Sequence, residues 1–253
     1  MSVGELVLGA IVGLVTGVML GSYLRPMAAL IERRARKDWA DPVLVSVERD
    51  PVIIWAGAPD WVGFSVYVDD PRRFAKENAP PGRDNWLDWA RSLNAVDAIS
   101  TPLKITIQAR VEAAVLVENV RVLGHRQVPL KGGMILTRGV GGADLEPRRF
   151  EIDLDWGQEP VVTWIKPGGE PGEPPALKLA AGDVEQFHVW ANSNQRGEAV
   201  WHEWTIELHL LVEGQKVTHR IDNGGSPFVT VSPGELPRKM NVAGTEKWDD
   251  WPT

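Results

Sequence analysis

The segment from Leu6 to Leu24 contains no charged side chain, and this feature constrains the chain more than any other. At about 1.5 Å per residue, a helix of this length spans roughly 28 Å, which is close to the thickness of a bilayer core. Glu5 is the only charged side chain before it. Basic side chains follow it at Arg25, Arg33, Arg34, Arg36 and Lys37.

This charge asymmetry predicts the topology, because basic flanks of membrane helices stay on the cytoplasmic side. We expect a single-pass protein of the cell membrane, with its N-terminus outside and its C-terminal domain in the cytoplasm. A cleavable signal peptide fits less well. The region before the apolar run has no Lys or Arg, and no small-residue cleavage site follows the run.

The same segment carries a glycine at every fourth position, at Gly9, Gly13, Gly17 and Gly21. Small residues at this spacing let two helices approach closely in lipid. The pattern therefore predicts self-association through the transmembrane helix. A glycine-rich anchor that stays monomeric is the alternative interpretation.

Charge and composition divide the chain into three parts: residues 1–24 (tail and transmembrane helix), 25–40 (a basic juxtamembrane helix at the lipid headgroups) and 41–253 (a globular domain). Residues 1–37 carry five basic and two acidic side chains, whereas the rest carries 22 basic and 32 acidic ones. The acidic globular part argues against nucleic acid as a partner. The absence of cysteine excludes disulfides and cysteine-ligated metals.

The globular part shows the period-two alternation of strands. Leu103, Ile105 and Ile107 alternate with polar residues, and similar short runs recur between turn residues. We expect a mainly β domain, an antiparallel immunoglobulin-like β-sandwich with one flanking helix over residues 85–93. Residues 51–55 are interpreted as a buried strand, and the Pro/Gly-rich stretch 166–175 as an internal loop.

Residues 201–222 contain the clearest hairpin signal. A two-residue turn at Gly214 and Gln215 suits the type II′ requirement for glycine at the first position. This register places Leu208 opposite Ile221 and brings the apolar side chains of both strands to one face. Residues 222–225 (Asp-Asn-Gly-Gly) are expected to form a tight turn into the next strand.

Three runs of the globular part form a recognisable pattern: Leu103-Lys-Ile-Thr-Ile-Gln108, Phe150-Glu-Ile-Asp-Leu-Asp155 and Ile221-Asp-Asn-Gly-Gly-Ser-Pro-Phe228. On these residues the chain resembles a group of uncharacterised actinobacterial proteins in which a β-rich module follows a helical or membrane segment. The resemblance covers roughly residues 85–230. It implies a β-sandwich and supplies no activity or site residue.

Two polar rows are candidate metal sites: Glu203, Thr205, Glu207 and His209 on one strand face, and Glu151, Asp153 and Asp155 on another. Side chains two residues apart on a strand lie nearly 7 Å from each other, which is too far to chelate one ion unaided. Neither the second row nor the 222–225 turn has calcium-loop spacing. We interpret them as solvated strand faces and a turn.

The aromatic and histidine content has two interpretations. Twelve tryptophans could stack on sugars or Pro-rich ligands, but they also suit a β core that uses tryptophan in place of phenylalanine and tyrosine. His219 falls on the apolar side of the hairpin, and His188 and His202 neighbour tryptophans. Packing is therefore the expected role of these histidines.

No nucleophile, phosphate-loop or cofactor signature occurs, so we predict no catalytic, cofactor or metal site and a non-enzymatic role. The expected function is a membrane-tethered interaction or scaffolding module whose partners are the lipid bilayer, further copies through the helix, and an unknown protein. One alternative is a subunit of an oligomeric membrane complex or pore built by the glycine face. Another is a ligand- or carbohydrate-binding domain or hydrolase that uses tryptophans and the acidic rows.

Overall fold

The computed structural model describes residues 41–55, 64–74, 85–110, 114–139, 149–157, 159–173, 177–242 and 247–251. The chain divides into two compact units, Met1–Pro42 and Val43–Thr253. The expected transmembrane segment, its glycines and the basic residues 25–37 all lie outside the described residues. Within the ranges described, no helix has the length and apolar character needed to cross a membrane.

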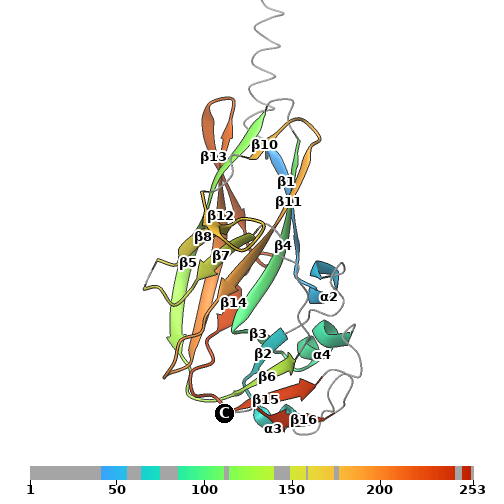
Figure 1. Cartoon of the computed structure of the whole chain (residues 1–253), viewed down its shortest axis with the longest axis vertical. Coiled ribbons are helices and arrows are strands. Elements are labelled where there is room, and N and C mark those ends of the chain that lie inside the picture. Colours follow the sequence, from blue (N-terminus) through green and yellow to red (C-terminus); the bar gives the residue numbers. More distant parts are fainter. Residues whose placement is uncertain are drawn as a thin grey trace, which may run out of the picture. The chain divides into compact units, whose positions relative to one another are not determined.

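The second unit is mainly β, as predicted, and its strands form two sheets (Figure 1). The first sheet has the order β1 (Val43–Glu48), β4 (Ser100–Ala109), β11 (Val184–Asn192), β7 (Arg149–Asp153), β8 (Val161–Ile165) and β9 (Pro171–Gly172). The second has the order β10 (Leu177–Leu179), β5 (Val115–Pro129), β12 (Val200–Val212), β14 (Phe228–Val231), β3 (Val96–Ala98), β2 (Phe64–Val68), β6 (Met134–Gly139), β15 (Arg238–Val242) and β16 (Trp248–Asp250). The strand β13 (Gln215–Ile221) also pairs with β12.

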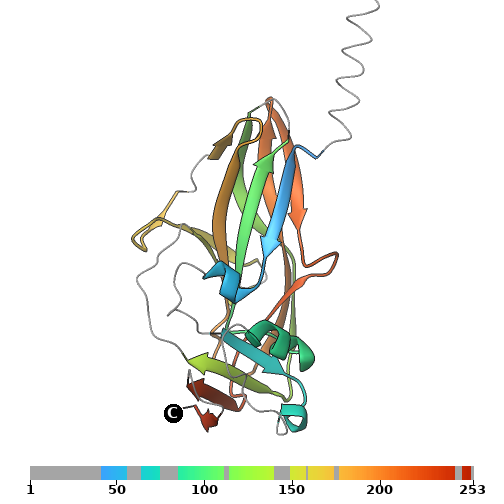
Figure 2. The ribbon, with the colours of Figure 1, turned by 90° about the vertical axis from the view of Figure 1, so that its right-hand side faces the viewer.

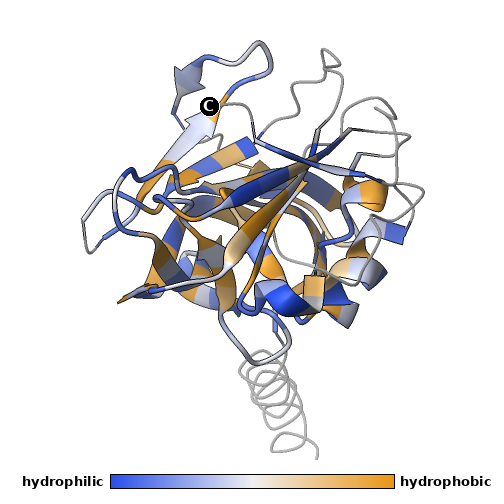
Figure 3. Ribbon diagram, turned by 90° about the horizontal axis from the view of Figure 1, so that it is seen from below, coloured by the Kyte–Doolittle hydropathy of each residue, from blue (hydrophilic) through white to orange (hydrophobic). Residues whose placement is uncertain are grey.

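The largest core lies between the two sheets. Leu103, Ile105 and Ile107 project into it from β4, while Trp204 and Ile206 meet them from β12 in the opposite sheet. These residues occupy alternate positions of their strands, and Figure 3 shows hydrophobic residues interleaved with hydrophilic ones along the strands. Each fully buried side chain of this kind stabilises the fold by about 1.5–3 kcal/mol. The predicted alternation thus produces a two-layered β core.

Most of the described strand pairs are antiparallel, but the sheets are mixed, which corrects the prediction of an antiparallel sandwich at three pairs. The pairs β7–β11, β3–β14 and β6–β15 run parallel, whereas the other pairs described are antiparallel. Alternation shows which residues face the core but not the direction of the neighbouring strand. Strand direction here depends on long crossovers.

A smaller core supports the other end of the second sheet, where β2, β3, β6, β15 and β16 continue beyond the sandwich (Figure 2). The short helices α3 (Pro71–Phe74) and α4 (Trp86–Ser92) contribute to it, and Trp86 of α4 packs there with Phe64 and Leu136. The helix predicted over residues 85–93 is confirmed, although the side chain of Asn85 makes no capping hydrogen bond.

Residues 51–54 form a helical turn, α2 (Pro51–Ile54), and the predicted strand there is wrong. Asp50 ends the extended segment and its Oδ1 accepts the Val52 N–H at 2.9 Å. Pro51 occupies the first turn, where its missing N–H costs nothing. The Asp50 cap and Pro51 therefore favour a helical turn here, although the apolar run that follows suits a strand.

The hairpin β12–β13 forms with a register two residues away from the predicted one. Val212 lies opposite Gln215 and Leu208 opposite His219. The turn is Glu213-Gly214, and both residues have positive φ (49° and 78°), as a type I′ turn requires. A shift of two keeps every side chain on its predicted face, so the apolar pattern could not reveal the error. Of the predicted loop 166–175, residues 171–172 form β9 on the edge of β8.

Candidate functional site

Two strands of the sandwich have an open edge among the described residues. On one side β5 pairs with β12 along almost its whole length, but on the other side only its residues 115–117 pair, with β10. In the first sheet, β8 pairs fully with β7, whereas β9 covers only Trp164 and Ile165. Residues 118–129 of β5 and 161–163 of β8 therefore have one edge without a described strand partner.

A groove of about 610 Å³ lies between these two edges. Residues 119–125 of β5 form one wall, and Glu159, Pro160 and Val162 form the other. The strand β10 stands at one end. At the other end, the Gln127 Nε2 donates to the carbonyl oxygens of Leu154 (3.5 Å) and Gly157 (3.1 Å), which ties β5 to the loop after β7.

Exposed apolar side chains lie in and near this groove: Leu123 lines it, and Val161 stands between the lining residues Pro160 and Val162. Leu123 is 40% exposed, Val161 41% and Trp156 67%. Trp156 directly precedes Gly157, the residue that Gln127 contacts. They are half of the six large hydrophobic residues that the described chain exposes. Such clustering is typical of a surface that binds a partner.

A β-bulge at Gly124 turns the following side chain toward the interior. The β5–β12 register shifts between Glu203 and Thr205, so that two residues of β5 lie opposite Trp204. Gly124 has a φ of 60°, a conformation that glycine adopts without cost. The shift lets His125 reach His202, whose Nδ1 lies 3.0 Å from the His125 Nε2.

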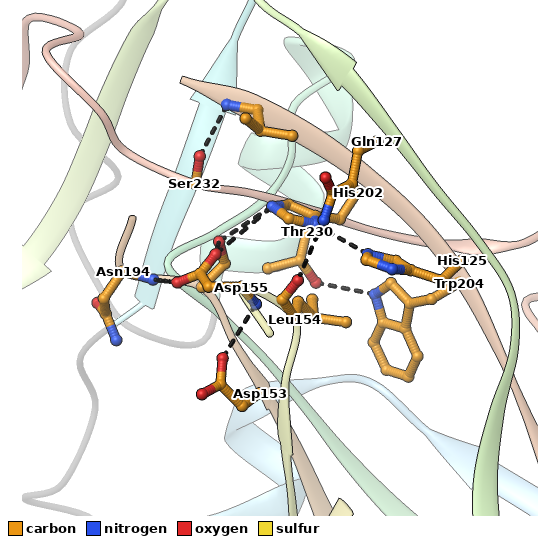
Figure 4. Close-up of polar contacts among 12 residues, drawn as sticks. His125, Gln127, Asp153, Leu154, Asp155, Asn194, His202, Trp204, Thr230 and Ser232 are labelled. Carbon is orange, nitrogen blue, oxygen red and sulfur yellow. Dashed lines mark hydrogen bonds and ion pairs between the residues drawn. The ribbon is translucent and has the colours of Figure 1, made fainter. Parts of the chain in front are cut away.

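His125 is the outer member of a buried polar chain, which we call the histidine chain: His125, His202, Ser193 and Asp155 (Figure 4). The two imidazole rings stack nearly parallel, with 5.3 Å between centroids. The Nε2 of His202 lies 3.1 Å from the Ser193 Oγ and 3.7 Å from the Asp155 Oδ1. Asp155 accepts from the Ser193 hydroxyl (2.5 Å) and the Asn194 N–H (2.7 Å).

The acceptor at one end sets the direction of the hydrogen bonds. An ionised carboxylate only accepts, so Ser193 donates to Asp155 and accepts from the His202 Nε2–H. His202 Nδ1 then accepts from the His125 Nε2–H. Burial, and after it the nearby His125, lower the pKa of His202 to about 4, while Asp155 acts in the opposite sense. At pH 7 His202 is therefore a neutral relay between β5 and the other sheet.

The geometry does not suit nucleophilic catalysis. In a catalytic triad the carboxylate orients the imidazole, and the serine faces the substrate. Here the carboxylate holds the serine, and both Ser193 and His202 are buried. What the histidine chain does is join β5 and β12 to the ends of β7 and β11, which fixes the wall of the groove.

The first predicted polar row is dispersed among separate contacts. Glu203 pairs with Arg126 (3.3 Å), and the Thr205 hydroxyl donates to the Leu123 carbonyl (3.0 Å). Glu207 and His209 do meet, with 2.7 Å between Oε1 and Nε2, which is closer than the strand spacing suggested. No group of three metal-ligating side chains occurs in the part of the chain described.

The acidic row 151–155 also divides. Glu151 accepts from Arg149 (2.8 Å), Asp153 accepts the Asp155 N–H (2.9 Å), and Asp155 joins the histidine chain. The sequence pattern predicts packing for His202 and does not reveal its polar role. One sequence signal could have found it. His202 shares the inward phase of β12 with Trp204 and Ile206, and a histidine buried there requires polar partners.

The remaining histidines and tryptophans serve mainly in packing. His188 stacks edge-on against Trp55, and burial, with Lys104 and Arg149 nearby, lowers its pKa to about 4. His219 is half-buried on the hairpin. Trp156 is the one described tryptophan with an exposed side chain, and the half-buried Trp89 and Trp248 stack on each other with 5.6 Å between their ring centroids.

Comparison with models of known protein families, with curated proteins and with solved structures gave no match. The resemblance to actinobacterial membrane-associated proteins therefore stays a prediction. The candidate site is defined by its geometry alone.

Proposed function

We propose that this chain is a membrane-tethered interaction module that recognises a protein partner in the groove between β5 and β8. One observation carries the proposal: open edges of both sheets border a single groove whose surroundings expose Leu123, Trp156 and Val161. Stable sandwiches normally cover or blunt their edges. An edge that stays open beside apolar side chains suits a binding surface.

The wall of the groove is well suited to binding because it is rigid. The histidine chain and the Gln127 contacts hold β5 against the opposite sheet directly after Gly124, at residues 125 and 127. A binding surface that is already ordered loses less conformational entropy when the partner docks.

The membrane location and topology of the module are proposed from the sequence. The apolar segment 6–24 is the tether, the basic residues from Arg25 to Lys37 lie at the headgroups, and the acidic β domain extends into the cytoplasm. An immunoglobulin-like kinship is also part of the proposal. Two sheets around one core support it, although the parallel pairs depart from that pattern.

Site-specific photo-crosslinking tests the proposal on the full-length, membrane-embedded protein. A benzophenone amino acid at position 123 is expected to yield a discrete adduct with one partner protein. The matched control carries the same group at Val184, which is 57% exposed on β11 in the first sheet. If both positions give the same adducts, or neither gives any, the groove is not the recognition surface.

The contribution of the tether is separated by a Gly13→Ile/Gly17→Ile double variant. We expect it to lose oligomers in detergent, because bulky side chains prevent close helix approach, while the position-123 adduct persists. Loss of the adduct together with the oligomers would instead assign the function to the membrane helix.

A further inference from the structure

We infer that the partner binds as an additional β-strand on β5: an extended segment with an acidic side chain beside Arg121 and apolar side chains toward Leu123 and Val162. This inference rests on the proposed function and specifies how the groove works. It is carried by the backbone of β5, by the distribution of edge-blunting residues and by charge.

Over residues 119–123, the edge of β5 that faces the groove is not paired with any described strand. The Val120 N–H donates to the Oδ1 of the neighbouring Asn119 (2.8 Å), so a side chain occupies the place that a strand partner would take. In an antiparallel strand, alternate residues direct their N–H and C=O groups to the same side. The β5–β12 register is continuous from 119 to 123, so Val122 directs its groups to the same edge as Val120.

Features that oppose strand addition lie on both sides of residues 119–123. On the N-terminal side, a second shift of the β5–β12 register between Val117 and Asn119 leaves Glu118 as a bulge. The Gly124 bulge, the Arg126 side chain and Pro129 all lie C-terminal to residue 123. Each of them is a known means of preventing strand addition. Residues 119–123 carry no bulge or proline and extend over roughly 16 Å, which is enough for about five residues of a partner strand.

Charge indicates the chemistry of the added strand. Arg121 is exposed and forms no ion pair with any described residue. Glu207, directly opposite it on β12, is engaged by His209 at 2.7 Å. Cross-strand pairs of opposite charge favour pairing. An acidic residue on the incoming strand would pair with Arg121, while Leu123 and Val162 offer apolar contacts.

The test uses the full chain in nanodiscs, with a probe segment fused after Thr253 through a flexible linker of about 30 residues, which raises its effective concentration to the millimolar range. The probe is a hexapeptide of valine with a single central aspartate, so that the residue beside Arg121 can be acidic while its neighbours on the same face, toward Leu123, stay apolar. Amide hydrogen exchange within residues 118–124 is expected to slow roughly tenfold relative to a fusion in which alternate probe residues are proline. Equal exchange in the two fusions would overturn strand addition.

Variants of β5 make the result specific. Val122→Pro removes an edge-facing N–H and should abolish the protection, whereas Val122→Thr keeps both the N–H and the β-branched shape and should retain it. Arg121→Glu should reverse the preference, so that a valine–lysine probe protects and the valine–aspartate probe does not. Because Arg121 is exposed, this variant keeps the inference testable even where Val122→Pro unfolds. If the protection from exchange is the same in Val122→Pro and Arg121→Glu as in the wild type, the inference is overturned.

Failure here and failure of the proposed function give different results. If residue 123 crosslinks a partner but the probe protects no β5 amide, the groove binds side chains without adding a strand. If the probe protects β5 and residue 123 captures no partner, the edge accepts strands that no natural partner supplies, and the proposed function fails.

Discussion

Mild acid is expected to destabilise the folded domain through His202. This side chain is fully buried, and its pKa is lowered to about 4, against an ordinary value near 6.5 in an unfolded chain. At a pH between these two pKa values, the His202 side chain binds a proton in the unfolded state but not in the folded state. Stability is therefore complete above pH 6.5 and falls as the pH drops toward 4.

The magnitude follows from the two pKa values. Integrating the difference in bound protons between pH 7 and pH 5 gives a loss of about 2 kcal/mol in the free energy of unfolding from His202 alone. His188, whose pKa is also lowered to about 4, contributes in the same direction. Most carboxylates stay ionised above pH 5, so this interval isolates the histidines.

Denaturant unfolding of the full chain in detergent, followed by tryptophan fluorescence from pH 7 to pH 5, measures the effect. His202→Gln cannot titrate, so its stability should vary with pH by about 2 kcal/mol less than that of the wild type over this interval. A His202→Gln variant with an unchanged slope would refute the assignment of a buried, neutral imidazole.

Two further predictions concern the backbone and are measured by denaturant unfolding. Gly234→Ala should lower the free energy of unfolding by about 3 kcal/mol, because the added Cβ would lie 2.5 Å from the Ala199 nitrogen at a φ of +45°. Gly182→Ala, at a φ of +83° but in open space, should lower it by only about 1 kcal/mol. Equal losses in the two variants would contradict the packing argument. Asp50→Ala should lower stability by about 1 kcal/mol by removing the cap of α2 at Val52, whereas Asp50→Asn should be nearly neutral; a loss in Asp50→Asn as large as that in Asp50→Ala would show that charge and not capping matters.

Local patterns predicted much of the fold. The alternation around Ile105 and the helical spacing of Trp86, Trp89 and Leu93 both correspond to real elements, because a side chain's phase on a strand or helix depends on its immediate neighbours. The prediction failed at residues 51–54, where a capping aspartate and a proline outweighed an apolar run. It failed also at the β12–β13 turn, where Glu213 accepts a positive φ.

The candidate site could not be predicted in this way. His125 and His202 are 77 residues apart, and Ser193 and Asp155 are 38 apart. Each of these residues taken alone looks like an ordinary strand or turn residue. Their partnership depends on β5 and β12 pairing with a bulge at Gly124, and on the ends of β7 and β11 reaching the same place.

The amino-acid sequence by itself determined that this domain is mainly β and which side chains of each strand face inward, because both follow from hydrophobic periodicity along a few consecutive residues. Only the tertiary structure decided the strand order, the parallel pairs, the open edge of β5 and the histidine chain behind it. Those features arise from hydrogen bonds between segments distant in sequence, and the order in which strands pair leaves no local periodicity to detect.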